Sequence, residues 1–431
     1  MKTASEEYFS GHQKYIKLFA SIGVLLLGIT FLILTGALRQ SSFPIGDGPY
    51  YHLAAAGTDE IGIGTGWNFL LQYFPMKYLL IATGLLTILL LGLNFKSFSF
   101  EERIVALCIF ILSPGFIYFF NVGERFGAAF LFSLLTSCFI FNKKYIFAAV
   151  SALIIFLFDV HVGLFVLFML LLYYLHNLKK RKMLYLLVLA SLIFIFSIGG
   201  EYGGFISDFG SGIGSSIFSL LFVVFCFFLF WNKKNILQLY GIAFLFFLLS
   251  LKFEFGILYF SAVLSLLISL CFFEILKRKW ESKTARDLIL LIVICGILFS
   301  GLSYVNRISL DKPDENIFKA LEKLPDNAVV FSDIGYGNWI LYSGKRNVWS
   351  SMMNRDEIRN IEDDLSFVFE DIDYSETIKM LQRYEVDYIL IDGDLREKWH
   401  KSGLIYLLRY NNENFKFLFE DDGVEAWRFF R

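Results

Sequence analysis

A short polar stretch, residues 44–52 (PIGDGPYYH), follows the first long apolar segment and holds the residues best suited to chemistry. Asp47 lies between two glycines, so the backbone can turn sharply there and let a substrate approach. A carboxylate in this position can accept a proton from a bound acceptor, which is general-base chemistry. The rings of Tyr50 and Tyr51 suit the headgroup level of a bilayer. The alternative interpretation is a solvated loop aspartate beside interfacial tyrosines.

Two further pairs of residues suit the chemistry of phosphate or metal. Glu124 is followed by Arg125, and a guanidinium offers planar, bidentate donors to an oxyanion such as phosphate. A simple ion pair at a helix end is the alternative. Asp159 and His161 are separated by one residue, and this pair can serve as metal ligands or as phosphate contacts. A histidine satisfied within a turn is the alternative there.

The remaining polar groups of this half of the chain have simpler interpretations. Asp59 and Glu60 lie in a Gly-rich stretch and are predicted to be solvated. The Gly-rich loop 199–212 has the flexibility of a substrate gate, with a plain linker as the alternative. Lys252 and Glu254 are two positions apart, and an ion pair explains them without a function.

The composition places these residues in a membrane protein. The chain has 431 residues, of which 56% are hydrophobic, 19% aromatic and only 18% charged, a balance that soluble domains of this length do not show. The cysteines lie inside apolar runs without disulfide or metal spacing. The first run has no cleavage pattern behind it and is predicted to stay in place as an anchor.

Apolar runs long enough to span a bilayer predict about eleven transmembrane helices. They lie at about 15–38, 76–93, 104–120, 126–141, 145–158, 162–175, 183–198, 213–231, 236–251, 255–275 and 287–304. Residues 1–304 hold 22 Lys and Arg against 15 Asp and Glu, a net charge of +7, whereas residues 305–431 hold 17 against 25, a net charge of −8. We therefore predict a membrane domain, 1–304, followed by an acidic soluble domain, 305–431.

The basic residues predict the orientation of the bundle. Clusters such as Lys143/Lys144 and Lys179–Lys182 occupy every second segment between helices, and such segments are cytoplasmic by the positive-inside rule. The chain is thus predicted to cross the cell membrane many times, with a cytoplasmic amino terminus and an extracytoplasmic carboxy-terminal domain. Asp47, Glu124, Asp159 and Glu254 then fall on outer loops. Almost no ionisable residue lies within a span, which counts against an ion-coupled transporter.

The last 127 residues predict a small α/β domain. Helices are expected at 316–324, 336–342, 355–369, 375–384 and 396–410, strands at 328–332 and 387–391, and a hairpin at 415–430. No Gly-rich phosphate loop, zinc spacing or nucleophile elbow is present in it.

Three separated segments resemble the GT-C membrane glycosyltransferases, most closely the catalytic subunits of oligosaccharyltransferases. Residues 47–53 (DGPYYHL) are similar to the first outer loop of that family, in which an acid is followed by aromatic residues and a histidine. Residues 113–118 (SPGFIY) and Glu124 are similar to the approach to its second acidic motif. Residues 328–340 and 386–392 are similar to the start of its soluble domain. Where a Trp-Trp-Asp-Tyr-Gly motif would read an acceptor peptide, this chain keeps only Tyr336-Gly337.

The resemblance implies a GT-C-like helical bundle with a soluble α/β domain, and a glycosyltransferase of the kind used in protein glycosylation. Its donor would be a sugar on polyprenyl or dolichyl phosphate within the membrane lipid; the acceptor is left open, and no nucleic acid is involved. Asp47 would be catalytic, and Asp47 and Glu124 would bind Mg²⁺ or Mn²⁺. Substrate contacts would come from Tyr51, His52, Arg125, His161 and Tyr336.

Two other functions fit the same sequence. A transporter or flippase of lipid-linked sugars would use a similar bundle, although it needs a polar path that the spans lack. A membrane protein without catalysis, whose acidic outer domain binds a partner, would share the fold, because fold does not fix function.

Overall fold

The computed structural model describes residues 4–39, 44–56, 64–177, 216–313, 315–348, 367–370, 374–399 and 403–431. The chain forms two compact units. The helical unit comprises Met1–Gln40, Ile63–Trp67 and Phe74–Leu310. The C-terminal unit comprises Ser41–Gly62, Asn68–Tyr73 and Asp311–Arg431. The stretch that carries Asp47 therefore belongs to the C-terminal unit.

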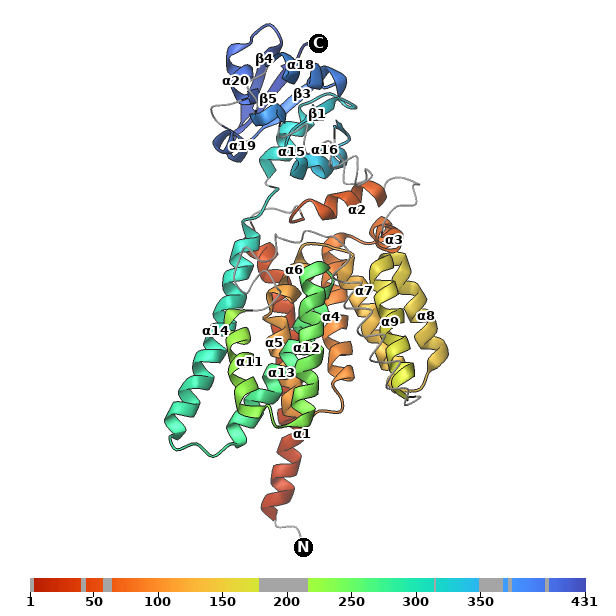
Figure 1. The fold of residues 1–431 in the computed structure, drawn as a ribbon, viewed down its shortest axis with the longest axis vertical. Coiled ribbons are helices and arrows are strands. Elements are labelled where there is room, and N and C mark those ends of the chain that lie inside the picture. The colour runs from red at the N-terminus through yellow and green to blue at the C-terminus, as the bar shows by residue number, and fades with distance from the viewer. Residues whose placement is uncertain are drawn as a thin grey trace. The chain divides into compact units, whose positions relative to one another are not determined.

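Long helices lying side by side make up the helical unit (Figure 1). Their bounds are α1 (Ala4–Leu38), α4 (Met76–Asn94), α5 (Phe100–Ile111), α6 (Pro114–Asn121), α7 (Phe126–Phe141), α8 (Tyr145–Phe158), α9 (Val160–Asn177), α11 (Ile217–Phe230), α12 (Lys234–Lys252), α13 (Gly256–Lys277) and α14 (Lys283–Ser309). The chain is a membrane protein built on apolar helices. The predicted span 183–198 and the loop 199–212 lie outside the described residues, as do Asp59 and Glu60.

Four described helices are long and apolar enough to cross a membrane, namely α4, α13, α14 and the part of α1 from Tyr15 to Leu38. A fifth span is obtained if α5 and α6, which meet at 60°, count as one. Shorter apolar helices of 10–17 residues account for α7, α8 and α11 and for parts of α9 and α12. The helical bundle is confirmed, whereas the number of eleven spans is not.

The predicted helix 104–120 is wrong as a single straight element. α5 ends at Ile111, and Ser113 caps α6, because its Oγ accepts the N–H of Phe116 at 3.2 Å. Pro114 follows at the first position of α6, where its missing N–H costs nothing. A proline inside a continuous helix would instead remove a hydrogen bond and clash with the preceding turn. The bend therefore follows from the Ser-Pro pair.

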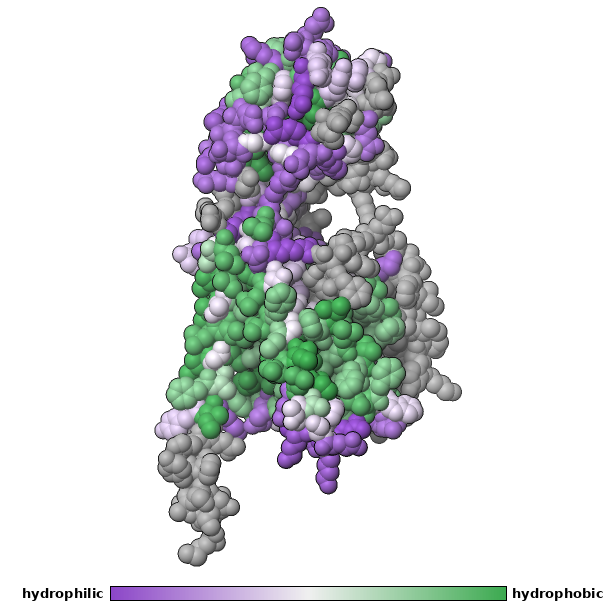
Figure 2. All heavy atoms as spheres, turned by 90° about the vertical axis from the view of Figure 1, so that its left-hand side faces the viewer, coloured by the Kyte–Doolittle hydropathy of each residue, from purple (hydrophilic) through white to green (hydrophobic). Residues whose placement is uncertain are grey.

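The helices of this unit differ in how much of their surface they bury. In α13, 72% of the most apolar 18-residue window is buried inside the protein, against 28% in α1 and in α14. Figure 2 shows the resulting apolar surface on one face of the helical unit. Exposed Leu291 and Phe299 of α14 contribute to the apolar exterior. We infer that α13 is the central helix and that α1 and α14 face lipid.

The C-terminal unit holds a five-stranded sheet with the order β2-β1-β3-β5-β4. Its strands are β1 (Val329–Phe331), β2 (Arg346–Asn347), β3 (Tyr388–Ile391), β4 (Phe415–Asp421) and β5 (Val424–Phe429). β1 pairs in parallel with β2 and β3, and β5 pairs antiparallel with β3 and β4. The helices of this unit are α2 (Gly48–Ala56), α15 (Glu315–Glu322), α16 (Gly337–Tyr342), α18 (Tyr374–Arg383), α19 (Gly393–Lys398) and α20 (Gly403–Tyr410), with α3 (Thr65–Tyr73) divided between the units (Figure 1).

The predicted α/β character of this domain is present, with two local differences. The short β2 is not predicted, because two residues are too few for an alternating pattern. The predicted helix 396–410 consists of α19 and α20, and α20 begins at Gly403, whose φ of +49° is left-handed. Of the predicted helix 355–369, only 367–369 are described, as part of a helical turn.

Tyr50 corrects the expectation that its ring lies at the bilayer headgroups. Its side chain is fully buried in the core of the C-terminal unit. The ring packs 5.3 Å from that of Phe318 and 5.2 Å from that of Tyr342, measured between centroids. Burial of a whole aromatic side chain is a large apolar contribution. The first turn of α2 is therefore folded into the α/β domain.

Candidate active site

Asp47 is held by one residue of the α/β domain. The backbone N–H of Asn338 donates to Oδ1 of Asp47 at 3.2 Å, and the side-chain amide of Asn338 donates to Oδ2. Asp47 is partly exposed. Together these two bonds fix the plane of the carboxylate. The side chain thus has the orientation and the access that a general base requires.

The backbone beside Asp47 is also fixed to the α/β domain. The N–H of Gly46 donates to the carbonyl of Lys312 at 2.8 Å, and the indole N–H of Trp339 donates to the carbonyl of Gly46 at 3.0 Å. Gly46 has a φ of +80°, a conformation that residues with a Cβ rarely adopt. The hydroxyl of Tyr50 donates to the carbonyl of Pro44 at 3.0 Å and closes the turn. Gly46 therefore allows the backbone of the loop to adopt this shape.

Tyr51 and His52 lie next to Asp47 in sequence, on α2. His52 is buried, and its Nδ1 lies 2.7 Å from Oδ1 of Asn68. The ring of Tyr51 meets the imidazole edge to face, with 5.0 Å between centroids. Tyr51 and His52, the substrate contacts predicted in this segment, are thus held in fixed positions. They belong to the same unit as Asp47.

Tyr336 takes part in a charged network at the ends of β1 and β3. Its hydroxyl donates to Asp392 and accepts from Nζ of Lys312 at 2.8 Å. Lys312 also forms ion pairs with Asp392 and, at 2.7 Å, with Asp394. Burial acts to raise the pKa of Asp392, but hydrogen bonds from Lys312, Tyr336 and the N–H of Leu395 outweigh it and lower that pKa. The Tyr336 ring packs against that of Trp339 at a tilt of 31°, with centroids 4.6 Å apart.

A second group of polar side chains gathers where loops of the helical unit meet. Nε of Arg125, between α6 and α7, donates to Oδ2 of Asp159 at 3.1 Å. Asp159, between α8 and α9, is only 4% exposed, and its Oδ1 accepts the N–H of Val162 at 3.0 Å. The guanidinium lies 4.7 Å from the centre of the Phe126 ring. Arg125 is thus the charge partner of a buried carboxylate, in agreement with the ion-pair alternative.

Glu254, between α12 and α13, joins this group. Burial and then the charge of Glu124 raise its pKa from 4.5 to about 8, although Arg125 and a hydrogen bond with Tyr118 act in the opposite direction. Burial likewise raises the pKa of Glu124, and Arg125 offsets this only in part. The interpretation of Glu254 as a surface partner of Lys252 is incomplete. Glu254 is partly buried, and charged residues of other loops, Glu124, Arg125 and Asp159, also act on it.

Stability should therefore depend on pH through Glu254. The carboxyl group of Glu254 stays protonated up to pH about 8 in the folded protein, whereas it loses its proton near pH 4.5 in the unfolded chain. The stabilisation is fully present below pH 4.5 and is lost as the pH rises through about 8. Glu254→Gln should remove this loss and raise Tm at pH about 9 by roughly 3 °C in detergent. The exposed Glu101→Gln variant is the control, and equal shifts in both variants would contradict the assignment.

His161 lies at the start of α9 with its side chain largely exposed, and its Nδ1 is 3.8 Å from Oδ1 of Asp159. Among the residues that the structure describes, no three His, Cys, Asp or Glu side chains are grouped as a metal site requires. Asp47 and Glu124 belong to different units, so their joint role as metal ligands stays a prediction.

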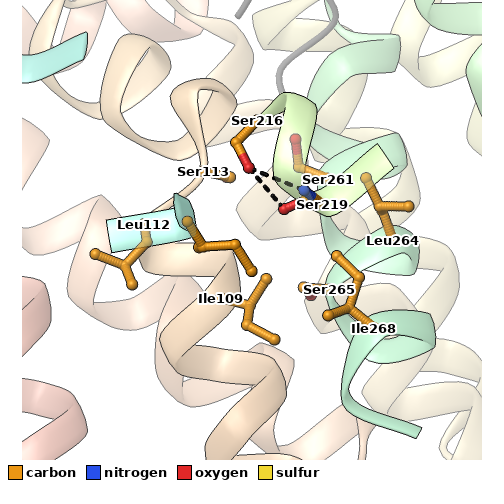
Figure 3. Close-up of a pocket in the computed structure, with 10 residues that line it drawn as sticks. Ile109, Leu112, Ser113, Ser216, Ser219, Ser261, Leu264, Ser265 and Ile268 are labelled. Carbon is orange, nitrogen blue, oxygen red and sulfur yellow. Dashed lines mark hydrogen bonds between the residues drawn. The ribbon is translucent and has the colours of Figure 1, made fainter. Parts of the chain in front are cut away.

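A small polar cavity inside the helical unit has no room for a sugar. Serine side chains line it from the bend between α5 and α6, from the start of α11 and from α13 (Figure 3). They are Ser113, Ser216, Ser219, Ser261 and Ser265. The Oγ atoms of Ser216 and Ser219 lie 2.9 Å apart. The cavity volume of about 10 Å³ is that of roughly one water molecule, which suits internal hydrogen bonding and excludes substrate binding.

Comparison with known proteins supplies the fold. Neither a protein-family model nor a characterised protein sequence matches the chain. The oligosaccharyltransferase of Archaeoglobus fulgidus, in its apo form, aligns with 96% of this chain and 75% of its own at a TM-score of 0.60 and 12% identity. With a tethered acceptor peptide containing the NVT sequon, it aligns with 98% of this chain and 75% of its own at a TM-score of 0.59 and 12% identity. The chain has the GT-C glycosyltransferase fold.

A second GT-C protein supports the same assignment. The mycobacterial arabinofuranosyltransferase AftD aligns with 97% of this chain and 40% of its own, with a TM-score of 0.53 and 12% identity. The predicted resemblance to the GT-C glycosyltransferases is thus confirmed at the level of the fold. Other structures of the Archaeoglobus fulgidus enzyme hold an inhibitory peptide with a dolichol-phosphate, or Zn and sulfate.

Proposed function

We propose that this protein is a membrane glycosyltransferase that moves a sugar or glycan from a polyprenyl- or dolichyl-phosphate donor to an acceptor on the outer face of the membrane. The observation that carries the proposal is the geometry of Asp47, a partly exposed carboxylate oriented through both oxygens in a chain with the GT-C fold. The oligosaccharyltransferase of the same fold has been seen with a dolichol-phosphate and with peptides, which supports a lipid-linked donor for this chain.

Asp47 is proposed as the general base. It takes the proton from the acceptor nucleophile while that atom forms a bond to the anomeric carbon. The bond from this carbon to the lipid phosphate breaks, and the phosphate leaves with the electron pair. Such a single displacement inverts the anomeric centre, as the GT-C resemblance implies. The transition state is oxocarbenium-like, so a nearby carboxylate also stabilises positive charge on the sugar.

The phosphate gathers negative charge as it departs, and a cation must balance it. We propose Arg125 and His161 for this task, since the guanidinium keeps N–H donors beyond the Nε that binds Asp159. A divalent ion, Mg²⁺ or Mn²⁺, would supply the same neutralisation when bound, and carboxylate oxygens such as those of Asp47 and Glu124 are the donors that suit it. Activity that survives EDTA and dialysis would remove the ion from the proposal.

Tyr51, His52 and Tyr336 stay proposed substrate contacts. The hydroxyl of Tyr336 already binds Lys312 and Asp392, and its side chain is buried in the core of the C-terminal unit. The Tyr-Gly remnant at Tyr336-Gly337 gives no support for peptide-sequon reading, and the acceptor class is left to experiment. The cytoplasmic amino terminus and extracytoplasmic carboxy-terminal domain are part of the proposal, based on the basic loops.

Mass spectrometry of glycolipids and glycoproteins from cells with and without the gene tests the function. Loss of the gene should remove one glycosylated product and leave its lipid-linked donor to accumulate. Flipping of labelled lipid-linked sugar in proteoliposomes, without a glycosidic product, would show a flippase instead. Unchanged glycolipids and glycoproteins would count against catalysis and favour the partner-binding function.

A further inference from the structure

Asn338 orients Asp47 through two hydrogen bonds. One comes from its backbone N–H and goes to Oδ1, and the other comes from its side-chain amide and goes to Oδ2. Two bonds from one residue to the two oxygens fix the plane of the carboxylate as well as its position. The Asn338 side chain is buried, so water competes little for the amide. This arrangement differs from a solvated loop aspartate, whose side chain would rotate freely.

The support behind Asn338 extends into the sheet. Trp339, the next residue of α16, donates to the carbonyl of Gly46. Its ring packs at a tilt against that of Tyr336, whose hydroxyl binds Asp392 at the end of β3. Lys312 connects the Asp47 loop to this group. Its carbonyl accepts the N–H of Gly46, and its Nζ binds Tyr336 and Asp392. The Asp47 loop and the ends of two parallel strands are therefore one connected network.

We propose that Asn338 is a positioning residue for Asp47, and that the network of Lys312, Tyr336, Trp339 and Asp392 keeps it in place. This inference rests on the proposed function, in which Asp47 is the base. The amide holds the carboxylate in one orientation, because it binds one oxygen while the backbone N–H of the same residue binds the other. The soluble domain thereby becomes part of the catalytic apparatus, since it supplies the orientation of the base.

Asn338→Ala should lower kcat by about 10- to 100-fold with little change in KM, because a misplaced catalytic group loses rate without losing substrate affinity. Membranes supplied with total lipid-linked sugar extracted from the host cells provide the assay. Asn338→Ser, which retains a short donor, should recover part of the lost kcat. A domain that has merely lost stability would show no such recovery.

Carbodiimide labelling of the full-length protein in detergent gives a readout that needs no substrate. Mass spectrometry of the peptide with Asp47 should show labelling about 3-fold or more above wild type in Asn338→Ala, because a carboxyl group that has lost the amide hydrogen bond is more accessible to the reagent. Asn414→Ala is the matched control, since it removes side-chain hydrogen bonds elsewhere in the same unit. It should leave both kcat and Asp47 labelling at wild-type values.

The two proposals fail in different ways. Equal Asp47 labelling in wild type, Asn338→Ala and Asn414→Ala would overturn the positioning role, whatever the activity. Raised labelling in Asn338→Ala with unchanged kcat would show that Asn338 holds a carboxylate that is not the base. Full activity of an Asp47 variant would reject the proposed function and leave the labelling result intact.

Discussion

Asp47→Asn is expected to lower the turnover of lipid-linked sugar by about 10²- to 10⁴-fold, the contribution usual for a positioned general base. The amide that replaces the carboxylate has no basic oxygen for the acceptor proton. Either the NH₂ group or the carbonyl of the new side chain must also face the side-chain amide of Asn338, which donates a hydrogen bond to the carboxylate in the wild-type protein. The measurement is transfer in membranes supplied with lipid-linked sugar, at matched protein levels. Donor KM should change little, because the loss lies in the chemical step.

A matched substitution in the same unit separates this effect from damage to the domain. Asp421→Asn removes a carboxylate of β4 that pairs with Lys323 at 2.7 Å. Exposed ion pairs of this kind contribute about 0–1 kcal/mol, so this variant should keep wild-type activity. Full transfer activity in Asp47→Asn would exclude Asp47 as the base. Equal losses in the two variants would show that the effect comes from the fold of the domain.

The sequence predicts the parts of the fold that depend on local patterns of apolar and polar residues. Apolar runs identify the helices of the bundle, and the buried Val-Val-Phe and Ile-Leu-Ile segments identify β1 and β3. The bend at Ser113-Pro114 is also visible in the residues, but the long apolar run around it hides the break. The short β2 has no such pattern, because its two residues are selected by the neighbouring β1 strand.

The candidate site is less predictable, because its contacts join distant residues. Asp47 is recognisable from its neighbours in sequence, yet its partner Asn338 is 291 positions away, and no local pattern links the two residues. Tyr50 is expected at the bilayer because aromatic residues are common there, whereas a core formed much later in the chain buries it. Spacing alone pairs Glu254 with Lys252. Burial and the charges of other loops determine the chemistry of Glu254 instead.

Arg125→Met is expected to destabilise the helical unit by about 3–5 kcal/mol, because it leaves the buried charge of Asp159 without its guanidinium. Thermal unfolding in detergent should show this as a lower Tm. Arg125→Lys keeps the charge and should lose less, although an ammonium is a poorer match for the Asp159 geometry. Asp159→Asn alone removes the buried charge and can still accept the N–H of Val162. The Arg125→Met/Asp159→Asn double variant should therefore recover most of the lost stability.

The same double-mutant cycle decides whether Arg125 also binds the donor phosphate. In the Asp159→Asn background the ion pair is already gone, so adding Arg125→Met changes only what Arg125 does elsewhere. If the guanidinium binds the donor, this second substitution should raise the donor KM by about 10-fold or more, as the loss of a charge-assisted hydrogen bond predicts. If Arg125 serves Asp159 alone, the donor KM of the single and double variants should coincide. That coincidence would leave the ion pair as the whole role of Arg125 and would assign the neutralisation of the phosphate to other cations.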